Sequence, residues 1–182
     1  REWDYEQHAL VTTVRTEREH LNTARQRFLE TGPLAFLPLR VAQNDDDQHF
    51  CSIVWSMLPE QAERMLALSE AEFNTELSAA LEFKLGEIQW SDKRFVFPLR
   101  QRHAIDYVKD KIVLVGDAAH TIHPLAGQGV NLGLLDVRAL AEELTGGIQA
   151  GRSIADSVVL ARDQRRRKGN HLSMMWLMEG FK

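Results

Sequence analysis

The first hundred residues show apolar and polar positions in the short alternating pattern that is typical of half-buried β-strands. Stretches rich in β-branched and aromatic residues predict four strands, over roughly 5–15, 24–28, 34–39 and 49–55. Gly32-Pro33 predicts a turn before the third of these strands, and Pro38 predicts that the third strand is an edge strand or bends. Strands joined by short polar connections favour an antiparallel sheet with one buried face.

A helical pattern then interrupts the strands. Pro59 suits the first position of a short helix over 60–68. Ser69 and Glu72 have the spacing of a capping box, so a second helix is predicted to begin there and to end at Gly86. After the helices, apolar residues alternate with polar ones and predict a half-buried strand pair that contains Ile88, Trp90, Phe95 and Phe97.

The pattern changes again at residue 112. Four apolar residues, 112–115, lie between polar boundaries and predict a fully buried strand. Gly116 and Asp117 follow at its carboxyl end, where open α/β sheets hold their ligands. Pro124 disfavours a helix just upstream of itself, and the glycines after it let the backbone approach a flat or charged ligand: Gly127, Gly129 and Gly133.

From Val130 onward the apolar spacing is helical, and the face expected to be buried contains Val130, Gly133, Leu134, Val137, Leu140, Ala141 and Leu144. Gly146-Gly147 is expected to end this helix, and Ser153 with Asp156 to begin another. The unpaired N–H groups and the dipole at the start of the first helix favour a ligand with acceptor atoms. Taken singly, Asp117 could be a turn residue and Gly127-Gln128-Gly129 a tight helix entry.

Residues 116–133 resemble the second FAD motif of the single-component (class A) flavoprotein aromatic hydroxylases. Residues 3–181 resemble the ubiquinone-biosynthesis branch of that family, which acts on polyprenylated phenols such as 2-octaprenylphenol. The resemblance implies that Asp117 accepts hydrogen bonds from the ribityl chain of FAD and that Pro124 lies against the isoalloxazine. It also implies that the backbone of Gly129, Val130 and Asn131 binds the pyrimidine end of the flavin. Gly116 and Gly127 complete the set of residues expected to bind FAD.

The implied reaction is hydroxylation of a polyprenylphenol ring by FAD, with NAD(P)H and O2 as co-substrates. The implied fold is α+β. Residues 1–107 would form an antiparallel substrate-binding sheet domain with a helical insertion, 108–150 the carboxyl-side part of an α/β FAD-binding domain of the glutathione-reductase type, and 151–182 a carboxyl-terminal helix. Two other hypotheses stay open: a FAD-dependent prenyl reductase of the same fold, and a non-catalytic substrate-holding or assembly module.

Parts of the family pattern are absent from the chain. No predicted strand is followed by GxGxxG with an acidic residue about 20 positions later, the arrangement that holds the ADP moiety. We therefore expect the chain to be the carboxyl-side fragment of a longer enzyme whose amino-terminal Rossmann half lies elsewhere. No catalytic residue can be assigned, although His120 and His123 are candidates for deprotonating the phenol.

Composition narrows the expected partners and location. A formal charge of −4 gives no global electrostatic reason to bind nucleic acid. Cys51 is the single cysteine, which excludes an internal disulfide framework, fits a reducing compartment and suggests a small apolar strand residue. His120 and His123 lack an evident third ligand, so no metal site is expected.

No apolar stretch reaches the ~20 residues of a membrane span, so the expected location is cytoplasmic, with peripheral contact at the inner membrane as an open alternative. A run of four basic residues, 165–168, would be a solvated helix face or a contact for anionic lipid or a partner protein. Homo-oligomerisation and a multi-enzyme ubiquinone-biosynthesis complex are further hypotheses.

Overall fold

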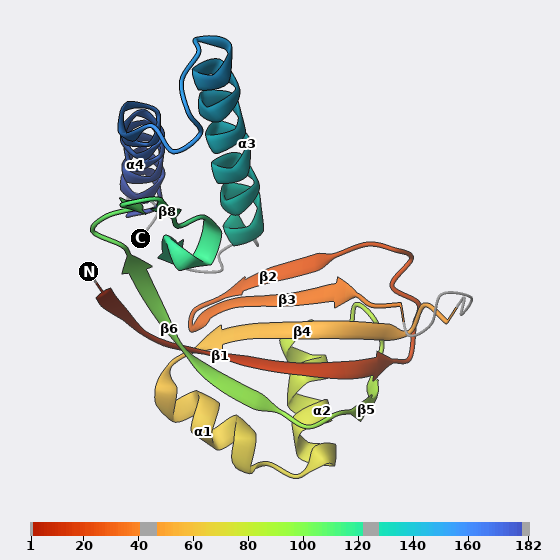
Figure 1. Ribbon diagram of the computed structural model, residues 1–182. Helices are drawn as coiled ribbons and strands as arrows, with labels where there is room; N and C mark the ends of the chain where they lie inside the picture. Colours follow the sequence, from red (N-terminus) through yellow and green to blue (C-terminus); the bar gives the residue numbers. More distant parts are fainter. Residues whose placement is uncertain (1, 41–46, 122–127, 180–182) are drawn as a thin grey trace. The chain divides into compact units, whose positions relative to one another are not determined.

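The computed structural model describes residues 2–40, 47–121 and 128–179, and describes side-chain environments within these ranges except at residues 128 and 170–179. The chain forms two compact units, one of residues 4–99 and one of residues 1–3 with 100–182. Figure 1 shows the elements of both units, which are described separately below.

The unit of residues 4–99 is built on an antiparallel sheet. Its strands are β1 (Glu2–Thr16), β2 (Arg25–Leu29), β3 (Gly32–Pro38), β4 (Phe50–Met57), β5 (Ile88–Ser91) and β6 (Phe95–His103). The strand order is β2-β3-β4-β1-β6, and β5 pairs with β1. The β1–β4 register places Leu10 opposite Trp55 and Val14 opposite Cys51. The four predicted strands of the first 55 residues are therefore confirmed.

Two helices, α1 (Pro59–Ala67) and α2 (Glu70–Ala80), cover one face of this sheet (Figure 1). The core between sheet and helices is mainly apolar, and Phe36, Ile53, Met65, Phe73 and Leu77 are each at most 1% exposed. Burial of this apolar surface supplies the main free energy that holds the layers together.

The predicted helix starts are confirmed. Pro59 lies in the first turn of α1. Ser69 accepts a hydrogen bond from the Glu72 N–H, and the Glu72 carboxylate accepts one from the Ser69 N–H at 2.9 Å, which is the expected capping box. The end of α2 was predicted wrongly. The helix ends at Ala80 rather than near Gly86, because Glu82 and Phe83 take positive φ angles that leave the helical conformation.

Two details of the sheet also differ from prediction. Leu29 pairs with Gly32, so the turn lies at residues 30–31 and Gly32, with φ of 138°, begins β3. Pro38 lies at the end of β3, which is flanked by β2 and β4 and is not an edge strand. A proline is tolerated there because the pairing of β3 with β2 ends at Phe36, and the ladder to β4 continues past Pro38, where the Leu39 N–H donates to the Phe50 carbonyl.

The strands after the helices exist, but they do not form the predicted pair. β5 hydrogen-bonds to β1, and β6 lies beside β1. Ile88 is buried, whereas Trp90, Phe95 and Phe97 are 40%, 48% and 54% exposed. Alternation identified these segments as strands, but it could not identify their partners.

The second unit contains short strands and two long helices. The elements are β7 (Val108–Lys109), β8 (Ile112–Val113), the 3-10 turn η1 (Gly116–Ala118), β9 (His120–Thr121), α3 (Gln128–Gln149) and α4 (Ser157–Glu179). β7 pairs with β8, and β9 pairs with the end of β6, with His103 opposite His120. Helices α3 and α4 lie side by side (Figure 1).

The prediction of a fully buried strand at 112–115 was wrong. Only Ile112 and Val113 are in strand conformation, their partner is the antiparallel β7, and Ile112 is 70% exposed. A run of apolar residues becomes a buried strand only where other strands flank it, and the described residues supply a single two-residue neighbour.

The predicted ends of the long helices need correction as well. Helix α3 continues through Gly146-Gly147 to Gln149. Gly147 lies where α3 contacts α4, and a Cβ there would lie 2.8 Å from Val159 Cγ2. Helix α4 begins after Asp156, whose carboxylate accepts the Val158 N–H at 2.8 Å, so Asp156 rather than Ser153 caps it.

Adjacent glycines of α3 should respond to alanine with opposite signs. Gly146→Ala meets no described atom within 4 Å, so it should stabilise the protein by up to about 1 kcal/mol through helix propensity. Gly147→Ala should destabilise it by roughly 1–3 kcal/mol because the new methyl group overlaps Val159, a stiff β-branched side chain. Denaturant unfolding of both variants tests this. Equal effects at the two positions would contradict the close helix crossing.

Cys51 should be inert to thiol reagents in the folded protein. Its side chain is fully buried, and burial raises the pKa of the thiol to about 11. At pH 8 the thiolate fraction is therefore on the order of one in a thousand. Labelling of the Cys51 peptide by N-ethylmaleimide, followed by mass spectrometry, should be slow before denaturant is added and fast afterwards. Rapid labelling of the native protein would show that β4 is open.

Candidate functional site

The candidate site begins at the one-turn 3-10 helix η1. Gly116 starts it with φ of +57°, a left-handed conformation that favours glycine, and the Ala119 N–H closes the turn on the Gly116 carbonyl at 2.8 Å. Asp117 is exposed, and its side chain has no hydrogen bond or ion pair with any other described residue. The turn therefore presents a carboxylate to its surroundings rather than using it internally.

The turn packs directly against α3 through two glycines. A Cβ on Gly133 would lie 3.3 Å from the Gly116 Cα, which is tighter than most real contacts. The backbones of η1 and α3 can therefore approach more closely than side chains would allow. This contact brings the predicted residue Gly116 and its neighbour Asp117 next to the amino-terminal half of α3.

The first turn of α3 contains three further predicted residues, Gly129, Val130 and Asn131. N–H groups in the first turn of any α-helix have no acceptor within the helix, and they lie at the positive end of its dipole. A Cβ on Gly129 would meet no described atom within 4 Å, so the backbone there is open to a close neighbour. Pro124 and Gly127, the other two predicted residues, lie outside the described residues, as does His123.

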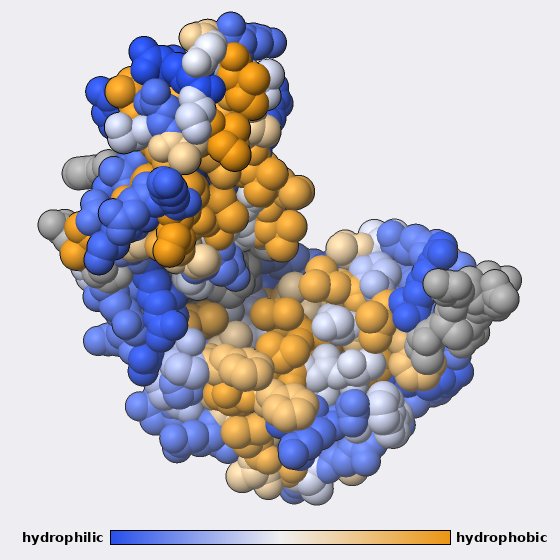
Figure 2. Space-filling view, viewed as in Figure 1, coloured by the Kyte–Doolittle hydropathy of each residue, from blue (hydrophilic) through white to orange (hydrophobic). Residues whose placement is uncertain are grey.

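The buried face of α3 is not the one predicted. Leu132, Asp136 and Ala139 are buried, whereas Val130, Leu134 and Val137 are exposed, Val130 by 74%. Figure 2 shows hydrophobic residues along the visible side of α3. The apolar periodicity identified the helix correctly but assigned the wrong face to the interior of this unit, because the interior is lined by charged groups.

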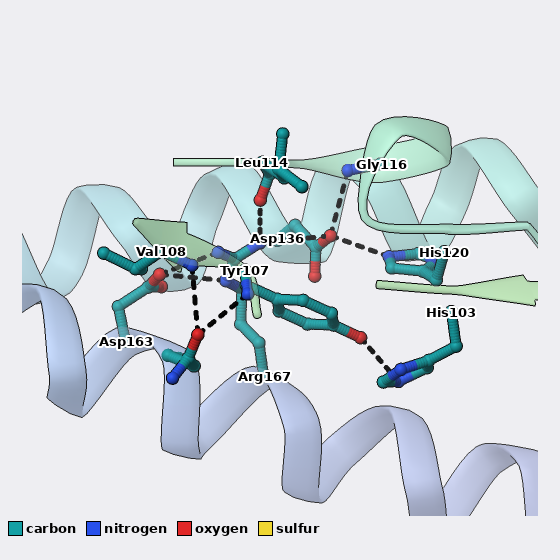
Figure 3. Close-up of polar contacts among 10 residues, drawn as sticks. His103, Tyr107, Val108, Leu114, Gly116, His120, Asp136, Asp163 and Arg167 are labelled. Atoms are coloured by element: carbon teal, nitrogen blue, oxygen red, sulfur yellow. Dashed lines mark hydrogen bonds and ion pairs between the residues drawn. The ribbon is translucent and has the colours of Figure 1, made fainter. Parts of the chain in front are cut away.

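These charged groups form a buried cluster behind η1 (Figure 3). Asp136, Asp163, Arg167 and His120 are each at most 3% exposed. Asp136 Oδ2 lies 2.8 Å from His120 Nε2, accepts the Gly116 N–H at 3.0 Å and lies 3.5 Å from an Arg167 nitrogen. Buried charges are stable only when opposite charges and hydrogen bonds compensate them. Here every charge has an opposite partner, although Asp163 Oδ1 and one terminal nitrogen of Arg167 make no hydrogen bond.

Arg167 of α4 links this cluster to Leu114, the residue that follows β8. Its Nε and one terminal nitrogen lie 3.0 and 2.8 Å from Asp163 Oδ2, and its other terminal nitrogen donates to the Leu114 carbonyl at 2.8 Å. The guanidinium also lies over the Tyr107 ring, 5.0 Å from its centre. Burial raises the pKa of the Asp163 carboxyl, while the hydrogen bond from Arg167 opposes that shift.

A neutral pair borders the charged cluster. The Tyr107 hydroxyl donates to His103 Nε2 at 2.7 Å, and His103 Nδ1 faces the Ala104 carbonyl at 2.9 Å. Burial raises the pKa of the Tyr107 phenol, with Asp136 adding to the effect, and burial lowers the pKa of His103. Both side chains are therefore held in their uncharged forms.

The structure gives His120 another role than the one expected from the sequence. As His120 is buried and bonded to Asp136, it is not presented to a substrate as a base.

The basic run 165–168 also differs from the expectation in part. Within the run, Arg167 is buried, Arg166 pairs with Glu142 at 2.6 Å, and Lys168 contacts the Ile105 carbonyl. The expectation of a solvated helix face therefore holds for the exposed Arg165 and Arg166 but not for the buried Arg167, and contact with anionic lipid or a partner protein stays a prediction. The i,i+4 spacing of Asp163 and Arg167 was the sequence signal that could have revealed the ion pair.

The geometry suits a ligand with hydroxyl groups and an acceptor-rich ring edge. An exposed carboxylate at Asp117 can accept hydrogen bonds from hydroxyls, and the first-turn N–H groups of α3 can donate to ring carbonyl and nitrogen acceptors. The open space at Gly129 permits a flat ring to contact backbone. These features fit the ribityl chain and the pyrimidine edge of FAD.

Comparisons with known proteins agree with this fit. The 3-demethoxyubiquinol 3-hydroxylase of Escherichia coli is 37% identical over 179 residues, which are 98% of this chain and 44% of that protein. The ubiquinone hydroxylase UbiL of Rhodospirillum rubrum is 36% identical over 177 residues, which are 97% of this chain and 40% of that protein. The chain thus spans less than half the length of these relatives.

Solved structures share the fold. PqsL of Pseudomonas aeruginosa, in complex with 2-aminobenzoylacetate, has a TM-score of 0.68 and 22% identity over 92% of this chain and 45% of its own. Residues 7–169 match the family described as FAD binding domain, and this range includes most of both compact units and every described part of the candidate site. The chain therefore belongs to the FAD binding domain family, as its resemblance to the flavoprotein hydroxylases led us to expect.

Proposed function

We propose that this chain is the carboxyl-side part of an FAD-dependent monooxygenase that hydroxylates the ring of a polyprenylated phenol in ubiquinone biosynthesis, with NAD(P)H and O2. The observation that carries the proposal is the packing of η1 on α3, with Asp117 exposed next to the amino-terminal half of the helix. The names of the Escherichia coli and Rhodospirillum rubrum relatives support this choice of reaction.

The described residues have distinct roles in holding FAD. The Asp117 carboxylate accepts hydrogen bonds from the ribityl hydroxyls, and the N–H groups of Gly129, Val130 and Asn131 bind the pyrimidine edge. Those N–H groups and the dipole of α3 stabilise negative charge at that edge, which favours the reduced cofactor. Bound FAD supplies the redox chemistry: it takes reducing equivalents from NAD(P)H and delivers one oxygen atom of O2 to the ring.

Two other parts of the chain support the proposal. Phe95 and Phe97 lie on the same face of β6 and are about half exposed, so they offer apolar surface to an aromatic or prenyl group. The exposed apolar face of α3 is suited to cover by further chain, as expected if the ADP-binding half lies elsewhere in the protein. Among the helices in the described ranges, none is long and apolar enough to cross a membrane.

Peripheral contact with the inner membrane, a homo-oligomer and a multi-enzyme complex remain proposals for the whole protein. The basic run 165–168 adds little support to membrane contact, because Arg167 is buried and Arg166 is paired. The finer division of the chain is also a proposal: a substrate-binding part over 1–107, an FAD-binding part over 108–150 and a helix over 151–182.

Removal of the Asp117 carboxylate should weaken FAD binding without unfolding the apoprotein. In the full-length protein, Asp117→Ala should raise the FAD Kd by roughly 10- to 150-fold, since a hydrogen bond from a hydroxyl to a carboxylate contributes roughly 1.5–3 kcal/mol. The melting temperature of the apoprotein should hardly change, because the side chain is exposed and has no described partner. Titration of the apoprotein with FAD, followed by flavin fluorescence, measures the Kd.

Asp106→Ala is the matched control, since it removes another exposed carboxylate of the same unit. The control should keep the FAD Kd of the parent protein. An unchanged Kd in Asp117→Ala would contradict the proposed ribityl contact.

Isotope labelling decides between the candidate reactions. The full-length holoenzyme, supplied with NAD(P)H, a polyprenylphenol and 18O2, should place one 18O atom in the product, as mass spectrometry would show. A reduced prenyl chain without 18O would favour the prenyl reductase instead. Bound FAD with no substrate-stimulated oxidation of NAD(P)H would favour the substrate-holding module.

A further inference from the structure

A single buried carboxylate oxygen contacts both sides of the turn that carries Asp117. Asp136 Oδ2 accepts the Gly116 N–H at 3.0 Å on one side and faces His120 Nε2 at 2.8 Å on the other (Figure 3). Gly116 is one residue before Asp117 and His120 three residues after it. The position of Asp117 is therefore fixed from both directions by one atom of α3.

The carboxylate is in turn held by Arg167 of α4. The Arg167 guanidinium lies 3.5 Å from Asp136 Oδ2 and donates to the carbonyl of Leu114, two residues before the turn. Asp163 and the Tyr107 ring confine the guanidinium on its other sides. Asp136 and Arg167 are each 1% exposed, so neither is free to relax into solvent.

Helix α3 contacts the turn at one level and presents its first-turn N–H groups at another. The first turn of α3 contains Gly129, Val130 and Asn131, and Asp136 follows about one and a half turns later. The Gly116–Gly133 contact lies between these two levels of the helix. A carboxylate at 136 therefore sets the distance between Asp117 and the first-turn N–H groups.

We propose that Asp136 is a positioning residue for FAD: its carboxylate, held by Arg167, orders the turn of residues 116–120 so that Asp117 and the first turn of α3 contact one cofactor molecule. This inference rests on the proposed function. Asp136 acts through the backbone of the turn and touches no part of the cofactor. Groups that orient a binding residue from behind affect affinity even though they make no contact with the ligand.

The test uses the full-length protein with Asp136→Asn, which keeps the size of the side chain but removes its charge. An amide oxygen can take the place of Oδ2, but it carries no formal charge, so the hydrogen bonds with Gly116 and His120 and the pairing with Arg167 should all weaken. We expect the FAD Kd to rise on the order of tenfold or more. We also expect faster hydrogen–deuterium exchange in a peptide covering residues 114–121 of the apoprotein, which reports the order of the turn without any cofactor.

Glu143→Gln is the matched control on the same helix. Glu143 pairs with Arg162 at 3.8 Å and Arg166 at 3.5 Å, so its loss also weakens the contact between α3 and α4, but two turns away from Asp136. The FAD Kd of Glu143→Gln, and its hydrogen–deuterium exchange over residues 114–121, should match those of the parent protein. If both variants lower FAD affinity in proportion to their loss of melting temperature, Asp136 has a structural role only and the inference is overturned.

A second pair of variants covers the case in which Asp136→Asn does not fold. His120→Gln retains an N–H donor near the position of Nε2, whereas His120→Ala removes it. The Gln variant should keep nearly the parent Kd for FAD, and the Ala variant should raise it by about tenfold. Equal affinity in both would overturn the inference.

The outcomes also separate this inference from the proposed function. If the parent protein binds FAD but hydroxylates no phenol, the proposed reaction fails while the Kd and exchange comparisons still decide the role of Asp136. If the parent binds no FAD, the proposed function fails outright, and the positioning inference fails with it, whatever the exchange of residues 114–121.

Discussion

The second unit depends on the need to satisfy one buried carboxylate. Asp136 lies on the inward side of α3, where an apolar residue would ordinarily be expected, and a charge in that position is tolerated only if donors surround it. The donors come from a turn twenty residues earlier, from His120 and from an arginine thirty-one residues later. Because all these donors contact the same carboxylate, they hold η1, α3 and α4 in one relative orientation. A purely apolar contact would not fix that orientation, since it has no directional requirement.

The two glycines of the turn contact complete this constraint. The left-handed conformation at Gly116 directs its N–H toward Asp136, and Gly133 leaves room for the turn to reach the helix backbone. A Cβ on Gly133 would lie 3.3 Å from the Gly116 Cα and would press on the turn, whereas at Gly116 the positive φ angle would strain any other residue. With the N–H of the turn used internally, the Asp117 side chain remains on the outer side, available to a ligand. The packing on one side thus produces the exposed group on the other.

Local signals predicted the elements well and the contacts less well. The capping box at Ser69 and Glu72 and the alternation of β1 and β4 depend on neighbouring residues, so the sequence alone was sufficient. The face of α3 was mispredicted because hydrophobic periodicity assumes an apolar interior, and this interior contains Asp136 and Arg167. The ion pair between Asp136 and Arg167 joins residues far apart in sequence, and no short motif encodes such a pair. Of the candidate site, the motif itself was identified from sequence, but the groups that hold it were not.

The two-sided character of α3 has a consequence for how the site is built. Its ionic side is satisfied within this unit, whereas its apolar side, including Val130 and Leu134, has no covering neighbour among the described residues. The groups that order the turn therefore do not depend on whatever covers the apolar side in a longer protein. Buried ionic contacts need specific geometry, whereas apolar contacts tolerate repacking. In α3 the ionic contacts, which are the more exacting of the two, lie next to the turn that carries Asp117. The shape of the turn is then fixed by the chain's own charges before any cofactor binds, and binding need not spend free energy on ordering it.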